Sequence, residues 1–169
     1  TYPGCEKIVI NTSGGRQQRF LLEDKNGHLW LGTSNGVAIR RKGQTKFEFL
    51  PANHPLTSLV VTELALDKEN NIWVGSESGL HKITEGKIKM ISKYKDIPFK
   101  RTTGVAQVPS GAIYLNVNGL NSFYKYEQGL LQPVKFEDPI LQRPHEVFHM
   151  LGDKKGNIWI GSSPSYKIG

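Results

Sequence analysis

Asp67-Lys68-Glu69-Asn70-Asn71-Ile72-Trp73-Val74-Gly75 is the stretch that decides the fold, because versions of it recur along the chain. The other copies begin at Asp24, Val108 and Asp153. Their central aromatic residues are Trp30, Trp73, Tyr114 and Trp159, at intervals of 43 (73 − 30), 41 (114 − 73) and 45 (159 − 114) residues. A strand-rich repeat of this length is typical of a β-propeller with one blade per repeat.

Each repeat contains the parts of a four-stranded antiparallel blade. In the first one, 18–23 reads as an inner strand, and Asp24 to Gly27 reads as a tight turn that Asp opens and Gly closes. Residues 28–33 form a second strand that is apolar on both faces, as expected when neighbouring blades cover both faces. In the second repeat Asn70 takes the place of the turn glycine, and Asn tolerates the same left-handed backbone.

Two shorter strands complete the predicted blade. A second turn leads to 37–40, and a more polar outer strand follows at 47–50, with counterparts at 87–91 and 131–136. An outer strand at 7–10 comes before three sets of four, and the fourth repeat adds three strands, the last at 165–168, so that sixteen strands are expected. We therefore treat residues 1–169 as a single β-propeller segment of about four blades. The ends either pair to close a four-bladed ring or leave an arc of a larger ring, and we favour the arc.

Composition excludes several classes of protein. The hydrophobic and charged fractions, 37% and 22%, are those of a globular domain, and no apolar run is long enough to cross a bilayer. Cys5 is the single cysteine, so no internal disulfide or multi-cysteine metal site is expected. The net charge of +7 is dispersed over all the repeats, which argues against nucleic acid as a partner.

Residues Asp24 to Val37 and Asp67 to Leu80 closely resemble the two-component regulator propeller repeat, and Asp153 to Ser162 is a partial match. The resemblance implies the periplasmic sensor region of a bacterial histidine kinase, hybrid two-component protein or diguanylate cyclase, commonly with seven-bladed rings. Membrane attachment would then come only from parts outside this chain. The third repeat departs from the pattern, with Val108 for Asp and Tyr114 for Trp.

The repeated residues themselves are better explained by structure than by chemistry. The three turn aspartates lie on different blades, too far apart to form a metal or acid–base site, and the tryptophans are expected to pack between blades. His28 occupies a variable position just after a turn, and His81 occupies a position typical of an exposed residue on a third strand. The sequence contains no phosphate-binding glycine loop, calcium loop or nucleophile elbow, so neither a cofactor nor a metal is expected.

The unrepeated connections are the better candidates for a site. Connections from an outer strand to the next inner strand frame the mouth of a propeller, where ligands usually bind. Side chains there with mixed hydrogen-bonding character suit a small ligand such as a carbohydrate, a carboxylate or a peptide. The predicted ligand-binding residues are Asn53, His54, Arg101, Arg143 and His145.

Three functions remain open at this point. The first is a non-catalytic extracytoplasmic sensor segment of a two-component-type protein, whose partners are the remaining blades or a second copy of the chain. The second is a propeller enzyme resembling streptogramin lyases, which would need a His/Glu cluster at the mouth. The third is a scaffold for protein interactions that binds no small ligand.

Overall fold

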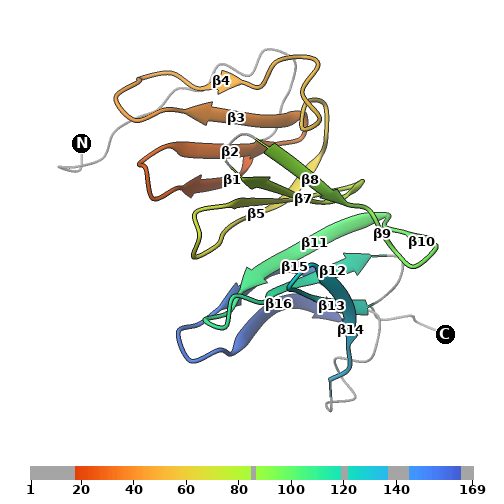
Figure 1. Ribbon diagram of the computed structural model, residues 1–169. Helices are drawn as coiled ribbons and strands as arrows, with labels where there is room; N and C mark the ends of the chain where they lie inside the picture. Colours follow the sequence, from red (N-terminus) through yellow and green to blue (C-terminus); the bar gives the residue numbers. More distant parts are fainter. Residues whose placement is uncertain (1–17, 85–86, 119–121, 137–144, 165–169) are drawn as a thin grey trace.

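The computed structural model describes residues 18–84, 87–118, 122–136 and 145–164, which form β-strands and no helix (Figure 1). Blade 1 contains β1 (Gln18–Glu23), β2 (Leu29–Thr33), β3 (Gly36–Arg40) and β4 (Glu48–Phe49). Blade 2 contains β5 (Val61–Leu66), β6 (Ile72–Ser76), β7 (Gly79–Thr84) and β8 (Lys87–Ile91). Blade 3 contains β11 (Arg101–Gln107), β12 (Ile113–Asn118), β13 (Ser122–Glu127) and β14 (Leu130–Val134). Blade 4 is described through β15 (His145–Gly152) and β16 (Ile158–Pro164).

The strands of each blade pair in chain order and antiparallel, which confirms the predicted blade of four strands. The predicted inner strand 18–23 and outer strand 87–91 have the observed bounds. A short hairpin, β9 (Lys93–Tyr94) and β10 (Ile97–Pro98), lies in the connection between blades 2 and 3, where no strand was expected. The strands predicted at 7–10 and 165–168 lie outside the described residues.

The turn from inner to second strand has the predicted geometry. Asp24 Oδ1 accepts hydrogen bonds from the backbone N–H groups of Asn26 and His28, both at 2.9 Å. Gly27 has a φ of 79°, and Asn70 takes the same left-handed conformation with a φ of 67°. Asn at that position was therefore correctly read as a substitute for glycine.

The second carboxylate oxygen of the turn aspartate has a role that the sequence did not reveal. It accepts a hydrogen bond from the indole Nε1–H six residues later, at 2.9 Å from Trp73 to Asp67. The same bond joins Trp30 to Asp24 at 2.9 Å and Trp159 to Asp153 at 3.1 Å. The third repeat has Val108 in place of the aspartate and Tyr114 in place of the tryptophan. Because both partners change together, no buried N–H donor and no buried carboxylate is left without its partner.

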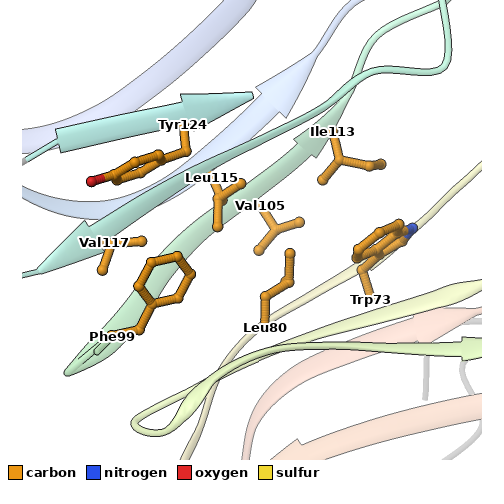
Figure 2. Packing of buried hydrophobic residues seen from close by; sticks show 8 residues of the cluster. All are labelled: Trp73, Leu80, Phe99, Val105, Ile113, Leu115, Val117 and Tyr124. Atoms are coloured by element: carbon orange, nitrogen blue, oxygen red, sulfur yellow. The ribbon is translucent and has the colours of Figure 1, made fainter. Parts of the chain in front are cut away.

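The core lies between blades, as the aromatic repeat predicted. Figure 2 shows Trp73 and Leu80 of blade 2 facing Val105, Ile113 and Leu115 of blade 3. Trp73 is only 1% exposed, and its ring meets Tyr126 of blade 3 edge-on at a centroid distance of 5.6 Å. Burial of an indole of this size, with its N–H paired, makes each blade interface a major source of stability.

The blades follow one another as an open arc. Among the described residues, inner strand β5 packs against β1 and β11, and β11 packs against β15, but no comparable packing joins β15 to β1. Trp159 is 62% exposed on the far face of blade 4, whereas the equivalent Trp73 is buried by blade 3. Leu21 is exposed on β1, although the equivalent Leu64 is buried against blade 1. These open faces fit an arc and do not fit a closed four-bladed ring.

Candidate functional site

The four inner strands share an irregularity at the same height. In β1, β5, β11 and β15 the register with the second strand shifts by one residue, as in a β-bulge. The residues that follow the shift are Phe20, Glu63, Gly104 and His149. Bulges in inner strands re-aim side chains, and in a propeller these strands surround the central channel.

Two of these equivalent positions form a polar pair across the arc. His149 Nδ1 lies 2.9 Å from Glu63 Oε2, although the residues are 86 positions apart and belong to blades 4 and 2. Strand β11 lies between their two strands and contributes Gly104 at this position, where a Cβ would come within 2.6 Å of Met150 of blade 4. The missing side chain on blade 3 therefore makes room for Met150 and lets blade 4 pack closely against β11.

Burial differs sharply between the two partners. Glu63 has a side-chain exposure of only 1%, whereas that of His149 is 61%. The second oxygen of Glu63 accepts a hydrogen bond from the backbone N–H of Leu64 at 3.1 Å. The carboxylate is thus fully engaged inside the protein, while the imidazole ring reaches solvent and is available to a ligand.

The environment changes the protonation of Glu63. Burial raises the pKa of this carboxyl to about 7, and the charge and hydrogen bond of His149 and the Leu64 N–H offset only part of that rise. Glu63 therefore gains or loses a proton near neutral pH. When Glu63 is ionised it accepts a hydrogen bond from Nδ1–H of His149.

The surroundings of the pair are mainly apolar. A depression of about 530 Å³ is lined by the inner strands, including Phe20, Val105 and Met150 as well as the pair itself. Its volume lies in the range of small-molecule pockets. Among the residues described in this structure, no group of three or more metal-ligating side chains occurs, and no helix is long and apolar enough to cross a membrane.

The structure describes the surroundings of three of the five predicted site residues, Arg101, Asn53 and His54. Arg101 begins β11, three residues before Gly104, and its Nε is buried without a hydrogen-bond partner among the described residues. Asn53 is exposed in the connection between β4 and β5. His54 in the same connection accepts from the Leu56 N–H at 3.2 Å, and burial lowers its pKa.

The remaining predicted residues cannot be placed to the same degree. Arg143 lies outside the described residues, and for His145 only the backbone pairing with Pro164 at the start of β15 is described.

His81 was expected to be exposed, but this was wrong: it is 2% exposed between blades. Burial lowers its pKa, and a hydrogen bond with the backbone of Val74 offsets part of that effect.

Glu63 was not among the predicted site residues, although the sequence contains a pattern that indicates it. It is the charged residue in Val61-Thr62-Glu63-Leu64-Ala65-Leu66, an inner strand that neighbouring blades cover on both faces. His149 stands at the equivalent repeat position, because 86 residues also separate Trp73 from Trp159 (159 − 73). An ionisable residue at the same inner-strand position in two repeats indicates a pair.

Comparison with known proteins identifies the repeats. The sequence pattern of the two-component regulator propeller matches residues 19–35 and 142–163. These segments contain the first two strands of blades 1 and 4. These two segments are two-component regulator propeller repeats. Histidine kinase P4 of Formosa agariphila is 28% identical over 160 residues, covering 85% of this chain but 11% of the kinase.

Two solved structures, an extracellular domain of a two-component system and a lyase, share the fold of this chain. The extracellular domain of a hybrid two-component system from B. thetaiotaomicron has a TM-score of 0.71 and 20% identity, over 90% of this chain and 22% of its own. Virginiamycin B lyase from Staphylococcus aureus, in an inactive variant with quinupristin, has a TM-score of 0.68 and 14% identity. That match covers 88% of this chain and 50% of the lyase.

Proposed function

We propose that this chain is part of a non-catalytic, ligand-sensing β-propeller in the extracytoplasmic region of a bacterial two-component-type signalling protein. Its repeats, the histidine kinase relative and the similarity to an extracellular two-component domain support this proposal. Because the chain spans about a tenth of that kinase and about a fifth of that domain, the output activity would reside in other parts of the protein.

The observation that carries the proposal is the Glu63–His149 pair on the inner strands. It offers an imidazole edge to a ligand inside an otherwise apolar depression. Arg101 on β11 starts about 10 Å further along the strand, at roughly 3.3 Å per residue. Its unpartnered Nε suits a carboxylate. A carbohydrate or carboxylate ligand therefore fits, with Asn53, His54, Arg143 and His145 as further contacts to be tested.

The open faces of the arc support a proposal about partners. Exposed Leu21 and Trp159 stand where neighbouring blades cover the equivalent residues elsewhere in the chain. Further blades of the same protein, as in a seven-bladed ring, or a second copy of the chain would bury them. We propose a periplasmic location, attachment to the membrane only through other parts of the protein, and no role in nucleic-acid binding.

Two experiments test the sensor proposal. Alkaline phosphatase fused next to these blades in the intact protein should be active, because the enzyme needs an oxidising compartment for its disulfides. D-galacturonate, which is both a sugar and a carboxylate, should bind the protein in calorimetry, and Arg101→Ala should weaken it by about tenfold or more. Lys46→Ala, exposed near the outer strand of blade 1, is the matched control. An inactive fusion, or equal binding by both variants, would count against the proposal.

A second candidate function is a propeller enzyme that resembles streptogramin lyases. It is favoured by one observation: a buried carboxylate orients the exposed His149 imidazole, the arrangement of a general base. If it were correct, the protein would linearise quinupristin, and His149→Ala would abolish the reaction. We expect no turnover, because no metal-ligating cluster accompanies the pair among the described residues.

A further inference from the structure

A groove separates blades 1 and 2 away from the central channel. Its volume is about 700 Å³, within the range of ligand sites. Its apolar wall consists of Trp30, Ile39, Leu50, Ile72 and Ile83. We refer to this space, bounded by those five residues, as the blade 1–2 groove.

The equivalent place between blades 2 and 3 is filled by an aromatic ring. Tyr126 of blade 3 projects against Trp73 of blade 2, with ring centroids 5.6 Å apart and planes at 66°. The phenol oxygen of Tyr126 accepts a hydrogen bond from Lys89 Nζ at 3.0 Å. Lys82 adds its ammonium group over the indole, 5.2 Å from the ring centroid. An edge-on aromatic pair with a cation nearby is a favourable packing.

Register shows which residues replace these groups at the blade 1–2 groove. Tyr126 pairs with Ile113 at the start of a second strand, and Ile83 pairs with Ile72 at the same place in blade 2. Lys82 pairs with Trp73, and Ile39 pairs with Trp30 in the same way. The indole of Trp30 therefore has neither an aromatic ring from position 83 nor an ammonium group from position 39 over it, while Lys82 and Glu69 contribute charged groups to the lining of the groove.

The ends of the groove are polar. His28, His54 and Asn70 contribute to its lining, together with the turn residue Asp24. Asp24 is already saturated by the backbone and by Trp30 Nε1, so it holds the indole in place and does not compete for a ligand. An aromatic ring would lie against Trp30 and Ile83, and its polar substituents would meet the histidines.

We propose that the blade 1–2 groove is a binding site for a small phenolic compound, whose ring takes the place that Tyr126 occupies in the next interface. Its apolar wall and polar ends match a ring with hydroxyl substituents. Occupation by a tyrosine side chain of another protein is the competing outcome. The inference does not depend on the sensor proposal, since binding is measured directly and at a different place from the Glu63–His149 pair.

The test uses p-cresol, the side chain of tyrosine, with the intact protein. Titration followed by saturation-transfer NMR should give a Kd of roughly 1 mM, which is reasonable for eight heavy atoms. Ile83→Tyr copies blade 3 and should fill the groove, weakening binding at least about tenfold without lowering the melting temperature. Ile83→Val leaves the groove open and should bind as the wild type does.

A second variant guards against a folding defect in Ile83→Tyr. Ile83→Phe fills the same space with a ring that carries no hydroxyl, and should also weaken p-cresol binding by at least about tenfold. Three results would overturn the proposal: no binding of p-cresol to the wild type, equal binding to both filled variants, or equal binding of 4-methylcyclohexanol, which lacks the aromatic ring. Binding of a tyrosine-containing tetrapeptide more than about tenfold tighter than p-cresol would assign the groove to a protein partner instead.

Discussion

Glu63 Oε2 and His149 Nδ1 lie 2.9 Å apart across an intervening inner strand, so a buried carboxyl on blade 2 is joined to an exposed imidazole on blade 4. This contact fixes the relative position of three consecutive blades. It also joins the exposed imidazole to a buried carboxyl whose pKa burial raises to about 7.

The raised pKa of Glu63 predicts a loss of stability as pH rises. The folded protein binds this proton up to about pH 7, whereas the unfolded chain releases it near pH 4.5, so the free energy of unfolding should fall between those values. The contribution is at most about 3 kcal/mol, from 1.36 kcal/mol per pKa unit. In urea denaturation between pH 4.5 and 7.5, the free energy of unfolding of Glu63→Gln should not show this fall. An identical pH dependence in wild type and variant would contradict the assignment.

His81 should act in the opposite sense. Burial lowers its pKa in the folded protein, so acidification below the unfolded value of about 6.5 favours the unfolded chain. Its contribution to stability is therefore present above that pH and is lost as pH falls through the folded value. His81→Gln should retain more of its neutral-pH stability under acid than the wild type does, as measured by melting temperature from pH 7.5 to 4.5. The exposed Lys46 provides the control, and Lys46→Ala should leave the profile unchanged.

The Asp67–Trp73 bond predicts a non-additive pair of substitutions. Asp67→Val strands a buried indole N–H, and Trp73→Tyr removes the donor from a buried carboxylate, so each alone should cost about 2–4 kcal/mol. The double variant reproduces blade 3 and should cost about 1–2 kcal/mol less than the sum. Chemical denaturation of all four proteins completes the cycle. Strict additivity would show that the bond does not couple the two residues.

Gly161 provides a test of the open arc. A Cβ on the equivalent Gly32 would lie 2.6 Å from Val61 of the next blade, whereas a Cβ on Gly161 has the His149 carbonyl oxygen as its nearest neighbour, at 3.8 Å. If a fifth blade packs there in the intact protein, Gly161→Ala should lower the melting temperature by several degrees, for a cost of about 1–3 kcal/mol. Lys154→Ala, in the exposed turn, should have little effect. An unchanged melting temperature for Gly161→Ala would contradict the packing of a fifth blade at this position.

The fold could be predicted because its determinants are local. Asp24, Gly27 and Trp30 lie within one turn and one strand, so a single repeat contains the whole signal. The β9–β10 hairpin was missed because it lies in a connection that no other repeat copies. The turn carboxylate was read correctly as a turn former, but its bond to the indole depends on side-chain geometry that spacing does not specify.

The candidate site was harder to predict, because its members come from different blades. Glu63 and His149 meet only in the assembled blades, where β11 packs against both of their strands, and nothing in the local sequence of either residue indicates the other. Arg101 was predicted from its place in a connection, and its buried Nε lacks a hydrogen-bond partner in the described part of the chain. Whether the five predicted residues bind one ligand stays a prediction.

The Asp–Trp hydrogen bond begins and ends inside a single blade. Duplicating or deleting one complete repeat would therefore carry both partners along and leave no unpaired donor or charge behind. Substitution of one partner alone lacks that protection, and blade 3 shows the two changed together. Because the bond is complete within one repeat, propellers of this kind can gain or lose whole blades without passing through an intermediate that has an unpaired buried group.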